Sequence, residues 1–257
     1  MLETVDRISI LGSPVSVVDS YRKVYDIIVK KLQSDNSPFY ITVNNVHTVV
    51  TAVKDNHYNK IIRNSFLALP DGKPLTVVAK LKGVKNISRI FGPTFFEKSI
   101  DWSQKDGIKH FFFGGDKITQ EKILRKISES FPACNVAGNI IPPFRKFTEE
   151  ENNKFLKVIN NSAPDFIWVA LGAPKQEKWI YENYSKLNKG VMIGIGAGFD
   201  YFAGNLKHAP HWMKNFSLEW LYRLIQEPKR LWKRYLITNS LFLWYIALDF
   251  LRLRKFD

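Results

Sequence analysis

The sequence has a single cysteine, Cys134, among 257 residues. A disulfide within the chain is therefore excluded, and so is a zinc site built from several cysteines. Cys134 lies beside Val136 in a predicted short strand, and we interpret it as a packed thiol without a chemical role. The scarcity of cysteine favours a reducing, cytosolic environment.

Long apolar segments are also missing. In the strongly apolar C-terminal region the longest uninterrupted run extends only from Leu241 to Leu248, whereas a helix that spans a bilayer needs about 20 residues. The first residues include the acids Glu3 and Asp6 and have no long apolar core. This start is not typical of a secretory signal, so we expect the protein to stay inside the cell.

Acidic residues are too few to balance the basic ones. The chain has 38 Lys and Arg against 24 Asp and Glu, which gives a formal net charge of +14. Such an excess indicates an anionic partner, namely nucleic acid, an acidic membrane surface or a phosphorylated substrate. The length fits one sizeable domain, or one domain with an appendage, and the sequence has no internal repeat.

Several catalytic signatures are absent as well. The sequence has no D-x-D pair for a metal-bound nucleotide, no P-loop and no G-x-S-x-G elbow. His208 and His211 are three residues apart, but Pro210 interrupts a regular helix there and no third ligand is evident. These absences favour a metal-independent reaction on a phosphate-bearing substrate.

Short apolar runs alternate with segments of helical periodicity, such as the run of Tyr21, Val24, Ile27, Ile28 and Leu32 after Asp19. This order predicts an α/β fold, with a mostly parallel, Rossmann-like sheet flanked by helices. The predicted strands are Arg7 to Gly12, Phe39 to Val43, Phe66 to Leu69, His110 to Gly115, Asn135 to Gly138, Asp165 to Leu171 and Val191 to Ile195.

The segment from Trp168 to Trp179, WVALGAPKQEKW, joins the most apolar of these strands to a charged helix. In an open parallel sheet, ligands gather at the carboxyl ends of the strands, and the next helix offers unpaired N–H groups to an anion. Lys175, Gln176 and Lys178 lie near that helix end. We therefore predict a site for a phosphate-bearing ligand here.

Two other strand ends are candidates for the same cleft. GIGAGFD, from Gly194 to Asp200, resembles a dinucleotide loop, but its third glycine position is Phe199 and no acidic ribose partner follows, which argues against a nicotinamide enzyme. Asp71 stands in a Pro-Asp-Gly turn after another strand. It is either a turn former or a functional carboxylate that faces the same cleft as Asn44.

Residues 207–257 differ in character from residues 1–206, and we predict that they form a helical, basic and aromatic appendage to an α/β catalytic domain. From Arg223 onward the net charge is +5. Cationic and aromatic side chains together suit reversible binding to an anionic membrane. An ordinary packed helix pair remains an alternative, and a nucleic-acid site fits less well because the aromatics are grouped with aliphatic residues.

Four motifs together resemble the bacterial WecG/TagA/CpsF glycosyltransferases, glycosyltransferase family 26. They are LPDG at 69–72, ALGAPKQEKW at 170–179, GIGAGFDYFAG at 194–204 and LEWLYRLIQEPKR at 218–230. The resemblance implies transfer of a sugar from a UDP-sugar to an undecaprenyl-diphosphate-linked saccharide, with inversion, without a metal or other cofactor, and at the cytoplasmic face of the cell membrane. The pathway would be exopolysaccharide, capsule or teichoic acid linkage synthesis.

The resemblance also implies roles for individual residues. Asp71 would be the general base that removes the proton of the acceptor hydroxyl, and Thr42 and Asn44 would orient the acceptor or the sugar. The donor would be held by Gly172, Lys175, Gln176, Gly196, Gly198 and Asp200.

In the same comparison, the lipid diphosphate would be bound by basic residues of the appendage, because arginine pairs with phosphate oxygens. These are Arg223, Arg230 and either Lys233 or Arg234. His208 and Ala197 depart from the family pattern, so the identity of the sugar is not readable. Two further alternatives stay open: a non-catalytic binder of nucleotides or anionic lipid on the same scaffold, and a homo-oligomer that buries the apolar appendage.

Overall fold

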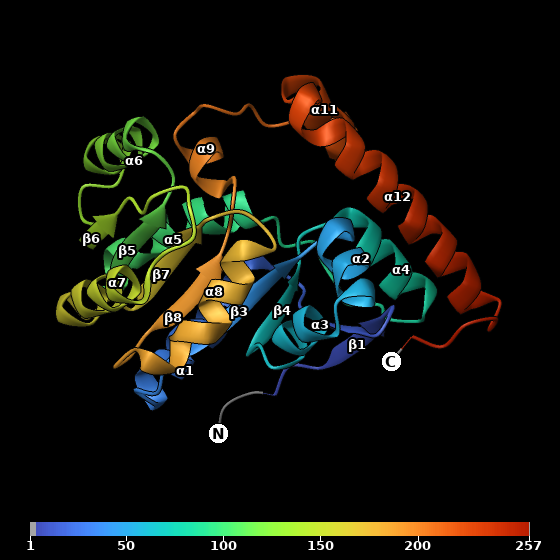
Figure 1. Ribbon diagram of the computed structural model, residues 1–257, viewed down its shortest axis with the longest axis horizontal. Coiled ribbons are helices and arrows are strands. Elements are labelled where there is room, and N and C mark those ends of the chain that lie inside the picture. The colour runs from blue at the N-terminus through green and yellow to red at the C-terminus, as the bar shows by residue number, and fades with distance from the viewer. Residues whose placement is uncertain (1–3, 257) are drawn as a thin grey trace.

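The computed structural model describes residues 4–256, and its centre is a six-stranded parallel sheet (Figure 1). The strand order is β4-β3-β8-β7-β5-β6, which confirms the predicted α/β fold. β4 lies outside β3 at one edge of the sheet, and β8, β7, β5 and β6 follow on the other side of β3. The carboxyl ends of these parallel strands lie at the same edge of the sheet, which is where ligands bind in open α/β sheets. The strands are β3 (Phe39–Asn44), β4 (Leu67–Pro70), β5 (Lys109–Gly114), β6 (Asn135–Ile140), β7 (Phe166–Ala170) and β8 (Val191–Gly194).

Helices cover both faces of the sheet. α2, α4 and α9 each begin within a few residues of a strand's carboxyl end, as in successive strand-to-helix units. The helices are α1 (Tyr21–Ser34), α2 (Val46–Lys54), α3 (Asn56–Arg63), α4 (Lys73–Leu81), α5 (Gly92–Asp106), α6 (Lys117–Ser130), α7 (Glu149–Ser162), α8 (Lys175–Asn183), the short 3-10 helix η1 (Tyr184–Lys186), α9 (Gly198–Phe202), α10 (His211–Asn215), α11 (Glu219–Gln226) and α12 (Pro228–Phe250).

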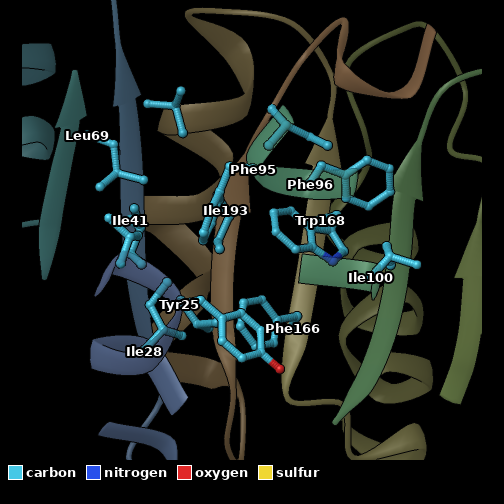
Figure 2. Packing of buried hydrophobic residues seen from close by; sticks show 14 of the residues in the cluster. Tyr25, Ile28, Ile41, Leu69, Phe95, Phe96, Ile100, Phe166, Trp168 and Ile193 are labelled. Carbon is cyan, nitrogen blue, oxygen red and sulfur yellow. The ribbon is translucent and has the colours of Figure 1, made fainter. Parts of the chain in front are cut away.

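Alternation along the strands divides the core into two layers. In β7, Phe166 and Trp168 point to one face while Ile167 and Val169 point to the other, and all four are fully buried. Figure 2 shows the first layer, where Trp168 packs against Phe96 of α5 with ring centroids 4.9 Å apart. The second layer packs against α3, α7 and α8. Burial on both faces explains why these strands are almost continuously apolar.

The N-terminal strand prediction is only partly correct. β1 (Arg7–Ile10) forms, but it pairs antiparallel with β2 (Ser13–Ser16) in a separate two-stranded sheet and does not join the main one. Leu11 and Gly12 both have positive φ, 50° and 76°, as a tight two-residue hairpin requires. The following helix is capped by Ser20, whose hydroxyl accepts from the Lys23 N–H, and not by Asp19.

The C-terminal helices lie against the body of the protein. Figure 1 shows the linker after α9 passing over one end of the sheet to α11, and α12 lying alongside α2 and α4. Phe242 of α12 is buried with residues of β1, β2, α2 and α4, and Lys82 pairs with Asp249 at 2.6 Å. Within residues 4–256, no helix has the length and apolarity to cross a membrane.

Candidate active site

Two adjoining cavities lie at the carboxyl ends of the strands. The larger, about 390 Å³, lies between the α2 and α4 side and the C-terminal helices. The smaller, about 120 Å³, lies at the ends of β7 and β8 and extends to the same helices. Both cavities are lined by Asn45, His47, Asp71, Phe91 and Arg223. Asp71 is therefore at the junction between them.

The Asp71 loop is held from three directions. The Asp71 N–H donates to the Asn44 carbonyl at 2.8 Å, and the Gly92 N–H, at the start of α5, donates to Asp71 Oδ1 at 2.8 Å. Arg89 donates to the Asp71 carbonyl and also pairs with Glu219 of α11. The carboxyl group is thus oriented by α5, and its loop is tied to the appendage.

Thr42 and Asn44 lie on β3, which pairs with the strand that leads to Asp71, but they do not line either cavity. Asn44 donates to Thr42 Oγ1 at 3.1 Å, and the Thr42 hydroxyl donates to Ser65 Oγ at 3.2 Å. These three buried polar side chains form a row on one face of β3. Alternation along the strand sends Val43 toward the smaller cavity and its two neighbours away from it. Asn44 therefore contacts the Asp71 loop through its backbone carbonyl, and not through its side chain.

Asn45 and His47 line both cavities, and the sequence reasoning missed them. Asn45 caps α2 by accepting from the His47 and Thr48 N–H groups at 3.0 and 3.3 Å. This capping box places His47 in the first turn, facing the site. Burial, with the charge of Arg234 in second place, lowers the pKa of His47 to about 4. Its buried Nδ1 has no hydrogen-bond partner among the described residues.

Four glycines of the motifs ALGAPKQEKW and GIGAGFDYFAG line the smaller cavity: Gly172, Gly194, Gly196 and Gly198. The buried side chain of Gln176 lies among them. A Cβ on Gly194 would be only 2.9 Å from Gln176 Nε2, and Gly196 has a φ of 48°. The missing side chains therefore allow both the close approach of Gln176 and the backbone conformation.

Two predicted donor-binding residues do not line the cavities. The side chain of Lys175 is exposed at the start of α8. Asp200 lies behind the glycine loop, where Asn205 donates to its Oδ1 at 3.3 Å and burial raises its pKa. The Asp200 carbonyl also accepts from the Asn205 and Leu206 N–H groups. These contacts stabilise the turn that leads from α9 to the appendage.

Three arginines of the appendage line the smaller cavity: Arg223, Arg230 and Arg234. Lys233 is exposed and lines neither cavity. Glu227 pairs with Arg230 at 2.5 Å and with Arg223 at 3.4 Å. Burial opposes ionisation of Glu227, but the two arginines lower its pKa overall. The Nε of Arg234 has no hydrogen-bond partner in the described chain.

Glycine backbone and arginine guanidinium groups therefore enclose one small space. Backbone N–H groups and guanidinium N–H groups are both hydrogen-bond donors, so together they suit an anion such as a diphosphate. The groups predicted to bind a donor and those predicted to bind a lipid diphosphate meet at the same cavity. Residues far apart in the sequence thus form one site.

The larger cavity has an apolar character. Its aromatic and aliphatic lining comes mostly from the C-terminal helices, and Asp71, Lys73 and Arg89 stand along its other side. A cavity of this composition suits a ligand with apolar and polar parts. The C-terminal side is lined by Phe216, Leu218, Trp220, Tyr235, Phe242 and Leu243.

In the described part of the chain, no group of three or more His, Cys, Asp or Glu side chains is arranged to hold a metal ion. His208 packs against the ring of Tyr201 at 4.8 Å. The side chain of His211 lies outside the described residues.

Comparison with known proteins gives consistent matches over most of the chain. The profile of the family described as "Glycosyl transferase WecG/TagA/CpsF family" matches residues 8–256. The N-acetylglucosaminyldiphosphoundecaprenol N-acetyl-beta-D-mannosaminyltransferase of Bacillus subtilis strain 168 is 33% identical over 235 residues, which cover 91% of this chain and 87% of the relative.

Two further relatives carry the same name. The protein of Bacillus spizizenii is 31% identical over 78% of this chain and 76% of its own length. That of Staphylococcus aureus strain MW2 is 26% identical over 84% and 82%.

Proposed function

Because the chain belongs to the WecG/TagA/CpsF glycosyltransferase family, we propose that it transfers a sugar from a UDP-sugar to an undecaprenyl-diphosphate-linked saccharide. The product would enter a bacterial cell-surface polysaccharide, as an exopolysaccharide, a capsule or a teichoic acid linkage unit. The relatives are named for transfer of N-acetylmannosamine to N-acetylglucosaminyldiphosphoundecaprenol. UDP-N-acetylmannosamine and that lipid are therefore the first pair to test.

The observation that carries the proposal is the junction of two unlike cavities at Asp71. The smaller cavity offers N–H groups and arginines to the diphosphate of the donor. The larger cavity offers an aromatic and apolar surface to the acceptor. A transferase needs both substrates to meet at the base, and positions them so that the reacting atoms are in contact.

In the proposed mechanism, Asp71 accepts the proton of an acceptor hydroxyl. The oxygen of that hydroxyl attacks the anomeric carbon of the donor at the same time. The bond from that carbon to the diphosphate oxygen breaks, and UDP leaves with the electron pair. Attack from the side opposite to the leaving group inverts the anomeric configuration. Arg223, Arg230 and Arg234 are assigned two roles: they bind the lipid diphosphate of the acceptor, and they stabilise the negative charge that develops on the leaving diphosphate, which is the role otherwise filled by a metal ion.

We place the reaction at the inner face of the cell membrane, with the protein bound peripherally. The C-terminal helices expose several large apolar side chains, and the exposed Lys233 is near them in the chain. An amphipathic, cationic surface of this kind supports reversible binding to anionic lipid. The exposed tryptophans are Trp212, Trp220, Trp232 and Trp244.

The proposal is tested by measuring UDP release from a panel of UDP-sugars, with and without N-acetylglucosaminyl-diphosphoundecaprenol and longer lipid-linked saccharides. We expect release only when a donor and a lipid-linked acceptor are both present, and the same rate with a metal chelator. UDP affinity or liposome binding without transfer to any acceptor would instead identify a non-catalytic nucleotide or lipid binder.

A further inference from the structure

Next to Gln176 in α8 stands Glu177, an acidic residue with no role in the proposed mechanism. Its side chain is only 3% exposed, yet the residue lines the smaller cavity. Oε1 accepts from Gln176 Nε2 at 2.8 Å, and the other neighbour of the carboxyl group is the buried hydroxyl of Tyr58. Burial of a carboxyl group costs stability, so its presence needs a reason other than packing.

The contacts of Gln176 supply that reason. The Gly172 N–H donates to Gln176 Oε1 at 3.2 Å, and Gln176 Nε2 donates to Glu177 at 2.8 Å. A backbone N–H can only donate, and the Glu177 oxygen accepts, so these two partners together allow a single orientation of the carboxamide. If Glu177 were removed, the Gly172 N–H would be the only one of these two contacts left, and Nε2 itself would lose its acceptor.

The fixed orientation has a consequence for the cavity. Nε2 carries two hydrogens and Glu177 occupies one of them, which leaves the second for a ligand beside Gly194 and Gly196. An N–H that is already aimed at an anionic oxygen binds more tightly than one that must first rotate. We propose that Glu177 is a positioning residue that locks the Gln176 carboxamide so that it donates to the diphosphate of the donor; this rests on the function proposed above.

The state of the carboxyl group agrees with such a role. Burial raises the pKa of Glu177 to about 7, and the buried hydroxyl of Tyr58, whose own pKa is raised well above its ordinary value by burial and by this carboxyl group, faces it. A carboxyl group that is partly neutral repels a neighbouring diphosphate less than a full charge does. Glu177 therefore serves as an acceptor for Gln176 without opposing the anion.

The test compares Glu177→Met with Glu177→Gln, because glutamine keeps an acceptor for Gln176 and methionine does not. The control is Glu182→Met, at an exposed acid on the same helix. We expect Glu177→Met to weaken UDP binding, measured by calorimetry, about tenfold, which is the effect of one lost hydrogen bond to a charged ligand. Glu177→Gln and Glu182→Met should stay within about threefold of wild type, and thermal unfolding should show that Glu177→Met is at least as stable as wild type.

A double-mutant cycle tests whether Glu177 acts through Gln176. Gln176→Ala should weaken UDP binding about tenfold as well, and Gln176→Ala/Glu177→Met should be no weaker than Gln176→Ala alone. Additive losses, or unchanged affinity in Glu177→Met, would overturn the proposal.

A measurement without ligand separates this inference from the proposed function. In nitrogen-15 NMR spectra of the unliganded protein, the side-chain amide protons of Gln176 should be protected from exchange in wild type and in Glu177→Gln but not in Glu177→Met. Equal protection in all three variants would disprove the positioning role. If wild type shows this protection but does not bind UDP, the assignment of the smaller cavity to the donor is wrong. The inference that Glu177 fixes the Gln176 carboxamide is still correct in that case.

Discussion

At the scale of single residues, Asp71 shows how an ordinary turn residue acquires a specific orientation. Asp-Gly turns are common, and nothing in the local sequence distinguishes this one. The fold adds the Gly92 N–H, which comes from the start of a helix 21 positions further along the chain, and the Arg89 side chain. Oδ1 is thereby occupied and the carboxyl group is directed at the junction of the two cavities.

Asp71→Asn should lower the rate of sugar transfer by about 10²- to 10⁴-fold, because the amide cannot accept the proton. The amide oxygen can still accept from Gly92, so thermal unfolding should be unchanged. Asp101→Asn, at an exposed position of α5, is the matched control and should keep full activity. Full activity of Asp71→Asn in the UDP-release assay would remove Asp71 from the mechanism.

His110 gives a pH-dependent stability at the same scale. It is fully buried in β5, where its Nδ1 accepts from the Trp168 indole at 3.0 Å, and burial lowers its pKa to about 3. The folded protein therefore holds His110 neutral while the unfolded chain protonates it below about pH 6.5. Its contribution to stability is present above that pH and is lost as the pH falls toward 3.

We expect the free energy of unfolding to fall more steeply between pH 7 and pH 4.5 in wild type than in His110→Phe, by about 2 kcal/mol. His47, whose pKa is also lowered, acts in the same direction in both proteins and so cancels in the comparison. Urea unfolding at the two pH values measures the difference. Equal pH dependence in both proteins would show that His110 does not titrate as described.

At the scale of elements, the short apolar runs located the seven predicted strands to within two positions at each end. α5 was not among the predicted elements, although it carries helix-terminating residues at both ends. Pro93 lies in its first turn and Gly107 ends it with a φ of 65°. α5 is central to the site because its first N–H holds Asp71.

α12 shows a choice that sequence could not make. Arg234 and Lys233 are adjacent and equally basic, but a helix turns by about 100° per residue, so only one of them can face the cavity. The contacts of α12 with α2 turn Arg234 toward His47 and leave Lys233 exposed. Orientation on a helix is decided by the whole apolar face that packs, and not by one pair of residues.

Arg234→Ala should therefore reduce the transfer rate or raise the apparent KM by about tenfold or more, because it removes a cation from the lining of the smaller cavity, the proposed diphosphate site. Lys233→Ala should leave the rate in detergent solution within about twofold of wild type. The two variants differ by one position and lose the same charge, so each is the control of the other. Comparable losses in both would argue for a general charge effect.

At the scale of the whole molecule, the C-terminal helices complete the site. Arg89 joins the Asp71 loop to Glu219, Lys82 joins α4 to Asp249, and Phe242 is buried against the hairpin and α2. The predicted boundary at 206/207 thus divides the chain by composition, while both cavities are built from both parts.

We expect the full chain to co-sediment with vesicles that contain anionic lipid, and to be released by salt, because the surface combines charge with exposed aromatic residues. Trp232→Ser/Trp244→Ser should weaken this binding at least several-fold and should leave UDP affinity unchanged, since neither tryptophan lines a cavity. Equal binding to neutral and anionic vesicles would contradict the electrostatic part of the proposal.

The sequence by itself determined the α/β class, through the periodicity of its apolar residues, and the family, through four motifs with chemically restricted positions such as the glycines near Gln176. It also located Asp71, Gln176 and the arginines. These features are local, because turns, caps and strand ends are encoded by neighbouring residues.

Only the tertiary structure decided which side chains meet. It placed β1 outside the main sheet, turned Thr42 and Asn44 away from the cavities, and brought in His47 and Glu177. Strand order and the docking of α12 are set by the packing of surfaces that are distant in the chain, and one residue of rotation along a strand or helix changes which face a side chain occupies.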